Sequence, residues 1–211
     1  MQIQAEGGRA LWMPNSLDPH LWAYTPAVNQ PSERLRMVYM GTRTHDADFA
    51  FLHRVLAQLH ALRPGSFSLT LVGVNANAVT LHDWVDVLSP PAYVGASYPA
   101  FVRWFVKQGP FDLGLAPLME NRFNRSKSGI KVLDYAGLGV PTLASDVAAY
   151  REQASSDRLL VANEEALWLA ALQRVQDDRG VLDSIRQAVV KAVAPEVFEN
   201  AVRMRWLSLT R

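Results

Sequence analysis

Cysteine is absent from the 211-residue sequence, which excludes disulfide bonds, thiolate nucleophiles and cysteine-ligated metal sites and is consistent with a reducing compartment. Long apolar runs are absent too, since no stretch approaches the roughly 18 to 20 residues that a membrane-spanning helix needs. The first residues, M-Q-I-Q-A-E-G-G-R-A, lack the basic region and apolar core of a secretion signal. We therefore expect a cytoplasmic protein with no transmembrane segment.

The sequence also lacks an excess of charge of either sign, with 21 Lys and Arg against 20 Asp and Glu. Non-specific attraction to nucleic acid or acidic membranes has no support from this balance, so we expect no nucleic-acid partner and only a local anion site. The five histidines form no H-E-x-x-H pattern. His53 and His60 are spaced to share a helix face, and a surface or interface pair is favoured over a metal site. No metal ion is expected.

Large apolar side chains precede the part of the chain that has a regular pattern. Residues 1–33 combine Trp12, Leu17, Leu21 and Trp22 with a segment rich in Pro, Asn, Gln and Ser, which is typical of an arm followed by a linker. These side chains are too large and too many for a solvated tail, so they should pack on the main domain or on a partner. The remainder, residues 34–211, is long enough for one α/β domain with a buried core.

Apolar runs bounded by glycine and proline alternate with helical periodicity from residue 35 onward. This alternation predicts an α/β fold, a Rossmann-like parallel sheet with helices on both faces, with an N-terminal arm and C-terminal helices. Ligands of such sheets bind outside the carboxyl ends of the strands, so residues 41–46, 73–76 and 117–128 should converge on one crevice. We expect strands at 35–40, 67–72, 85–88, 111–116, 142–145 and 159–162, and helices at 47–63, 98–106, 130–137, 148–154, 164–175, 181–193 and 196–207.

A basic loop that opens a helix lies between Asn121 and Asp146. Small and basic residues in such a loop present free backbone amides and the positive end of the helix dipole, an arrangement that holds phosphate. The helix should stop near Gly137 and Gly139, after which Pro141 leads into a strand. The basic and small residues of the loop are Arg122, Arg125, Ser126, Lys127, Ser128, Gly129 and Lys131.

Within this stretch, V-L-D-Y-A-G-L-G-V-P-T-L-A-S-D resembles the helix and strand near the end of the C-terminal domain of GT-B glycosyltransferases of group 1. Three other segments are similar to the same family. M-P-N-S-L-D-P-H-L-W resembles its interdomain segment, V-Y-M-G-T-R-T-H-D its first strand and loop, and F-D-L-G-L-A-P-L the strand before its donor loop. The four segments follow the family's order and spacing and cover most of the chain, so together they make a specific signal.

The resemblance implies a binding site for a nucleotide diphosphate sugar, the donor substrate, with no further cofactor and no metal. In the family's E-x7-E motif the second acid holds the nucleotide ribose, a role that falls to Asp134, whereas Ser126 stands where the first acid would face the donor sugar. Lys127 and Lys131, with Arg125 or Arg43, are the candidates for the diphosphate. The candidate donor-binding residues are Gly41, Thr42, Arg43, Arg125, Ser126, Lys127, Ser128, Lys131 and Asp134.

The resemblance further implies that this chain is the donor-binding half of a hexosyltransferase-like, retaining enzyme. In the family the acceptor and a catalytic side chain lie on an N-terminal domain, so no catalytic residue is assigned here and the isolated chain should be inactive without that partner. The alternative function is a non-catalytic nucleotide-binding or interaction module on the same fold. The alternative interpretation of the residues is a solvated helix position for Asp134 and a solvated stripe for Lys127 and Lys131.

Overall fold

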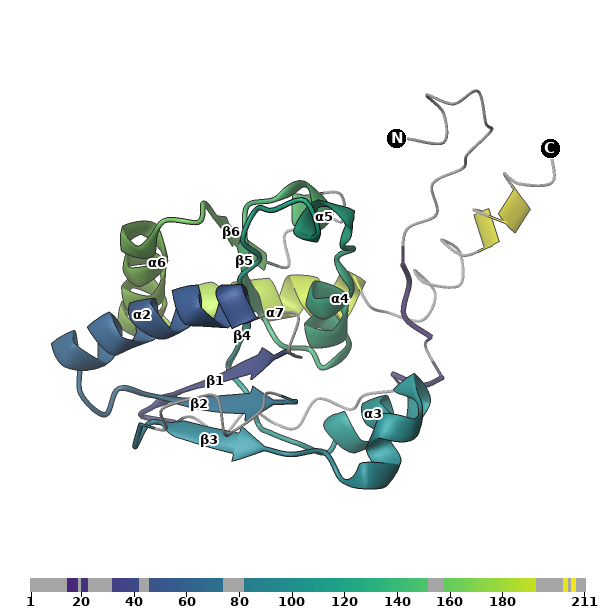
Figure 1. Ribbon diagram of the computed structural model, residues 1–211, viewed down its shortest axis with the longest axis horizontal. Helices are drawn as coiled ribbons and strands as arrows, with labels where there is room; N and C mark the ends of the chain where they lie inside the picture. Colours follow the sequence, from purple (N-terminus) through teal and green to yellow (C-terminus); the bar gives the residue numbers. More distant parts are fainter. Residues whose placement is uncertain are drawn as a thin grey trace.

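The computed structural model describes residues 15–18, 20–22, 32–41, 46–73, 82–151, 158–192, 203–204 and 206–207. Within these ranges six strands form one sheet in the order β3-β2-β1-β4-β5-β6 (Figure 1). All five neighbouring pairs are parallel, and the strand order reverses between β1 and β4. The strands are β1 (Leu35–Met40), β2 (Phe67–Val72), β3 (Val85–Leu88), β4 (Leu113–Ala116), β5 (Thr142–Ser145) and β6 (Arg158–Val161). The predicted Rossmann-like parallel sheet is confirmed.

Helices connect the strands on both faces of the sheet. They are α2 (Asp46–Leu62), α3 (Tyr98–Phe105), α4 (Ile130–Gly137), α5 (Ala148–Arg151), α6 (Glu165–Asp177) and α7 (Gly180–Ala192), with 3-10 turns η3 (Ala92–Ala96) and η4 (Asn124–Ser126). Local sequence sets several ends. The Ser97 side chain accepts a hydrogen bond from the amide of Ala100 at 3.3 Å, and Pro99 lies in the first turn of α3, where its missing amide hydrogen leaves no bond unmade.

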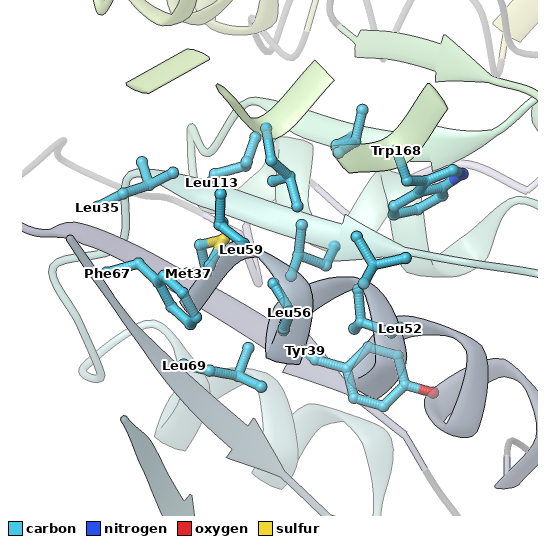
Figure 2. Packing of buried hydrophobic residues seen from close by; sticks show 14 of the residues in the cluster. Leu35, Met37, Tyr39, Leu52, Leu56, Leu59, Phe67, Leu69, Leu113 and Trp168 are labelled. Atoms are coloured by element: carbon cyan, nitrogen blue, oxygen red, sulfur yellow. The ribbon is translucent and has the colours of Figure 1, made fainter. Parts of the chain in front are cut away.

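One face of the sheet is covered by α2 and α6, which pack against each other. Figure 2 shows the leucines of α2 facing the side chains of β1, with Trp168 of α6 at the edge of the same cluster. Trp168 meets Phe51 of α2 edge-on, with the ring centroids 5.6 Å apart. Burying aromatic and leucine side chains in this way supplies most of the free energy that holds the two helices on the sheet.

The opposite face is covered by α3, α4 and the described part of the arm. Leu17 and Trp22 of the arm are 3% and 6% exposed and belong to the same buried cluster as Val132 of α4. The Trp22 ring lies so close to Gly137 that a β-carbon there would overlap it. The expectation that Leu17, Leu21 and Trp22 pack on the main domain is therefore confirmed, whereas Trp12 lies outside the described residues.

The structure shows which residues end α4 and begin α6. The helix end expected near Gly137 and Gly139 is set by Gly139, whose φ of 67° is unfavourable for residues with a side chain. Asn163 precedes two acids in the sequence, which predicts that it caps α6, but this prediction is wrong: the cap position is taken by Glu164, whose side chain makes no capping hydrogen bond. The Asn163 side chain instead bonds Leu118 and Ser145, which lie far away in the sequence.

Candidate functional site

A network of three hydrogen bonds holds the chain that follows β4 against the ends of β5 and β6. The amide of Leu118 donates to Oγ of Ser145 at 2.8 Å, and Nδ2 of Asn163 donates to the carbonyl of Leu118 at 2.9 Å. The Ser145 hydroxyl completes the network by donating to Oδ1 of Asn163 at 2.5 Å. The loop from residue 117 to residue 129 therefore starts from a fixed point at the carboxyl end of the sheet.

Helix α4 follows this loop and is fixed by the fully buried Tyr135. The Tyr135 hydroxyl accepts a hydrogen bond from the amide of Met40 at 2.9 Å, and its ring lies 2.6 Å from where a β-carbon on Gly114 would be. Only glycine at position 114 permits this approach. The amino end of α4 has Gly129 as its N-cap and no side-chain cap, so the dipole and first amides of the helix are available to an anion.

Lys131, in the first turn of α4, is a buried cation that has no hydrogen-bond partner within the described part of the chain. It is 8% exposed, and its Nζ lies 4.7 Å from the centroid of the Tyr39 ring. Burial lowers the pKa of Lys131 to about 7, an effect that the charge of Asp48 opposes and the charge of Lys127 reinforces. Because an unpaired buried ammonium is unfavourable, this position is suited to a bound anion.

Asp134 lies one turn further along α4 and is 6% exposed. Its Oδ1 accepts a hydrogen bond of 2.5 Å from the hydroxyl of Tyr98, at the start of α3. Burial raises the pKa of Asp134 to about 7, although the Tyr98 bond and the charge of Lys131 act to lower it. The alternative interpretations of a solvated helix position for Asp134 and a solvated stripe including Lys131 are therefore wrong.

Lys127 lies in the loop just before α4 and is half-buried. Its Nζ is 5.1 Å from the centroid of the exposed Phe123 ring, a cation–π contact. Burial lowers the pKa of Lys127, while the charge of Asp48 raises it. The charge of Lys127 in turn lowers the pKa of Lys131.

The remaining loop candidates lie at the surface around these groups. Arg125 and Ser126 are exposed residues of η4, and Ser128 is exposed just before α4. The hydroxyl of Ser128 accepts a hydrogen bond of 2.6 Å from Nδ2 of Asn15, so the arm reaches the loop directly.

Gly41 is the remaining candidate at the end of β1. Its amide donates to the carbonyl of Val72 at 3.0 Å, and a β-carbon on it would lie 2.8 Å from the Tyr39 ring, so its place in the site is one of close packing. Thr42 and Arg43 lie outside the described residues.

A pocket of about 300 Å³ opens beside the loop, between η4 and the start of α5. It adjoins the charged groups through Asn124, whose Nδ2 donates to the carbonyl of Met119 at 2.7 Å and lies 3.4 Å from Oδ1 of Asp48. The pocket is lined by Leu118, Met119, Glu120, Asn124, Arg125, Val147, Ala148 and Ala149.

Two residues of the site carried no sequence signal. Asp48 is 1% exposed in the first turn of α2, a position at which an acid commonly complements the helix dipole. Its charge nevertheless raises the pKa of both Lys127 and Lys131. Tyr98 follows a helix cap and has the pattern of an ordinary first-turn residue, yet it bonds Asp134. Neither role follows from spacing along the chain, because the partners are brought together by the sheet.

His53 forms its close histidine contact with His82 and not with His60. Nε2 of His53 lies 3.1 Å from Nε2 of His82, and the His82 ring stacks on Trp84 with centroids 4.9 Å apart. Burial and the charge of His82 lower the pKa of His53. Over the described ranges no cluster of three or more metal-ligating side chains occurs. None of the described helices has the length and apolar character that crossing a bilayer requires.

No protein-family model matches the sequence, and no curated protein matches it. Solved structures do match the fold. The C-terminal domain of a glycosyl transferase group 1 family protein, LpcC from Francisella tularensis, superposes with a TM-score of 0.59 at 14% identity, over 84% of this chain and 96% of that domain. HepE from Anabaena, in complex with UDP and glucose, superposes with a TM-score of 0.67 at 15% identity, over 99% of this chain and 59% of HepE.

WaaG, a glycosyltransferase involved in lipopolysaccharide biosynthesis, matches with a TM-score of 0.58 at 14% identity. The match covers 82% of this chain but only 47% of WaaG, so the chain spans about half the length of that enzyme. At these identities the likeness concerns the fold, which is the level at which the sequence resemblance is confirmed. The chain has the fold of the C-terminal domain of GT-B glycosyltransferases.

Proposed function

We propose that this chain is the donor-binding half of a glycosyltransferase that takes its sugar from a nucleotide diphosphate sugar. The observation that carries the proposal is Lys131, whose buried ammonium has no hydrogen-bond partner among the described residues and lies in the first turn of α4. A diphosphate at this position supplies the hydrogen-bond acceptors that the ammonium lacks there and also meets the helix dipole. The glycosyltransferase fold and the UDP named for HepE support the same ligand class.

In this proposal Lys131 and Lys127 bind the diphosphate, and Arg125 reaches it from η4. Their charges stabilise the negative charge that develops on the leaving nucleoside diphosphate as the bond to the sugar breaks. Asp134 accepts hydrogen bonds from the ribose hydroxyls through the carboxylate that Tyr98 orients. Ser126, exposed in η4, offers only a hydroxyl where the family resemblance places an acid, so sugar recognition relies on other groups.

The acceptor and the catalytic side chain are assigned to a partner, a GT-B N-terminal domain. Exposed apolar side chains support such a contact. Phe123 in the loop, Ile130 at the start of α4, and Met204 and Trp206 near the end of the chain are all exposed. Retention of configuration at the sugar, which rests on the family resemblance, and a cytoplasmic location, which rests on the sequence composition, complete the proposal. The isolated chain should bind nucleotide without transferring sugar.

Calorimetry with UDP, GDP and ADP, each paired with its nucleoside, tests the donor site. We expect at least one diphosphate to bind more tightly than its nucleoside, and Lys127→Ala to weaken the diphosphate more than the nucleoside. Lys107→Ala is the matched control, because Lys107 is exposed just after the carboxyl end of α3, whereas the site is contacted by Tyr98 at the amino end of that helix. The absence of heat with all three diphosphates at millimolar concentration would contradict the proposal.

A further inference from the structure

Asp48 is a buried carboxylate that joins α2 to the loop carrying the lysines. It is 1% exposed, and its Oδ1 accepts a hydrogen bond of 2.7 Å from the amide of Met119. The same oxygen lies 3.4 Å from Nδ2 of Asn124. These two donors lie just after β4 and in η4, so one carboxylate fixes the loop at two points.

Asn124 extends this connection within the loop. Its Nδ2 also donates to the carbonyl of Met119 at 2.7 Å, and its amide donates to Oδ1 of Asn121 at 2.7 Å. The chain between Met119 and Asn124 is thereby folded into a compact turn that ends three residues before Lys127. Loss of the Asp48 carboxylate would release the buried end of this turn.

The charge of Asp48 acts on the same two lysines that the proposed donor site uses. It raises the pKa of both Lys127 and Lys131, whereas burial lowers both. Other charges that act on Lys131 are Lys127, which lowers its pKa, and Asp134, which raises it. Asp48 is the largest charge effect on each lysine.

We propose that Asp48 is a positioning residue of the donor site, one that holds the loop leading from β4 to Lys127 and Lys131 in place for the diphosphate. Its negative charge has a second role there, because it favours the protonated form of both lysines. This inference rests on the proposed function. Asp48 is not assigned a contact with the ligand, and a carboxylate would repel a diphosphate. Its benefit therefore depends on pH: it is large where the lysines lose their protons and small where they are protonated in any case.

Asp48→Asn tests both roles, because the amide keeps an oxygen for Met119 but removes the charge. In the nucleotide-free protein we expect NMR of isotopically labelled lysines to show the pKa of Lys131 falling by about half a unit or more. Asp46→Asn is the matched control, since Asp46 is an exposed acid in the same helical turn. An unchanged Lys131 pKa in Asp48→Asn would overturn the proposed charge role, whether or not a nucleotide binds.

UDP affinity at two pH values gives the second readout. We expect Asp48→Asn to lose roughly threefold or more in affinity at pH 8 and less at pH 6, because protonation at the lower pH restores the lysine charges. Equal loss at both pH values would overturn the charge role and leave Asp48 with the loop-holding role alone. Failure of the wild-type protein to bind any nucleotide diphosphate would contradict the donor site itself, while the Lys131 titration would still decide the effect of Asp48.

Asp48→Glu provides a further test if the asparagine variant does not fold. Glutamate keeps the charge but cannot occupy the same position, so the amide of Met119 should exchange its hydrogen faster while the Lys131 pKa stays near its wild-type value. If the Met119 amide of Asp48→Glu instead exchanges its hydrogen as slowly as in wild type and the pKa of Lys131 falls, the positioning role is excluded.

Discussion

Tyr98 and Asp134 connect α3 to α4 through a hydrogen bond of 2.5 Å from the phenol hydroxyl to Oδ1 of the carboxylate. Asp134 is almost fully buried, whereas Tyr98 is 43% exposed. Burial also raises the pKa of the Tyr98 hydroxyl, as does the neighbouring Asp134, so the phenol remains a proton donor at neutral pH. A ligand that bonds Oδ1 of Asp134 has to share this atom with Tyr98. In the proposed donor site, Oδ2 is therefore the better acceptor for a ribose hydroxyl.

The proposed ribose role of Asp134 predicts a loss of affinity for the nucleoside as well as for the nucleotide. At pH 8, where most of the Asp134 carboxyl is ionised, Asp134→Asn should weaken uridine by about tenfold and UDP by at least as much, since a hydrogen bond to a charged group contributes about 1.5 kcal/mol. Calorimetry with both ligands measures this. Tyr98→Phe is the companion variant and should raise the pKa of Asp134 further. Unchanged affinity in Asp134→Asn would refute the ribose assignment.

Lys131, which we propose binds the diphosphate, should reduce the stability of the ligand-free protein. Replacing it with methionine removes a buried amine that has no hydrogen-bond partner among the described residues and leaves an apolar chain of similar length, so the free energy of unfolding should rise by about 1 kcal/mol or more. The same variant should lose most of its UDP affinity. Urea denaturation and calorimetry measure the two effects. A less stable Lys131→Met protein would mean that the ammonium has a structural role.

The shifted pKa values of Lys131 and Asp134 predict a minimum in their joint contribution to stability near pH 7. Lys131 titrates at about 7 in the folded protein and at 10.5 unfolded, so between these values the unfolded chain binds more protons and stability rises with pH. Asp134 titrates at about 7 folded and at 3.8 unfolded, so the folded chain binds more protons there and stability falls as pH rises.

Single variants separate the two sides of this minimum. Lys131→Met should remove the rise above pH 7, and Asp134→Asn should remove the fall below it, when each is compared with wild type by denaturation across pH 4 to 10. Subtracting the free energy of unfolding of wild type from that of each variant at every pH cancels the contributions of the other titrating groups. A difference curve that is flat on the side assigned to either residue would contradict the assignment of its pKa.

The fold could be predicted from sequence because its signals are local. Apolar runs ended by Gly41 and Gly73 predicted strands, and Gly139 predicted the end of α4 within a few residues. The loop between β4 and α4 could also be placed, since its basic composition and position follow from the chain order alone. These features depend on neighbours along the sequence, which is the information that periodicity and turn chemistry carry.

The electrostatics of the site could not be predicted, because burial depends on contacts made across the sheet. Whether Asp134 is solvated is decided by Tyr98, 36 residues away, and by the helices that pack around it. The pKa of Lys131 depends first on its burial and then on the charge of Asp48, which comes from a different helix. The failure of Asn163 to cap α6 has the same origin, since its side chain bonds partners that are distant in the sequence.

The contact between Trp22 and Gly137 makes the arm part of the folded domain. A β-carbon at position 137 would overlap the indole ring, so Gly137→Ala should destabilise the protein by about 1 to 3 kcal/mol by pushing the arm away from α4. Gly95→Ala is the matched control, because a β-carbon there meets no atom within 4 Å. Thermal or urea denaturation of the two variants gives the comparison.

A double-mutant cycle with Trp22→Ala isolates the cause. Without the indole ring, alanine at position 137 has room and is a better helix former than glycine, so Gly137→Ala should stabilise the Trp22→Ala protein by up to about 1 kcal/mol. The effect of one substitution thus changes sign with the presence of the ring. If Gly137→Ala is equally destabilising in both backgrounds, its effect arises within α4 and the arm does not pack there. Since Asn15 bonds Ser128, a displaced arm should also accelerate amide exchange in the loop before α4.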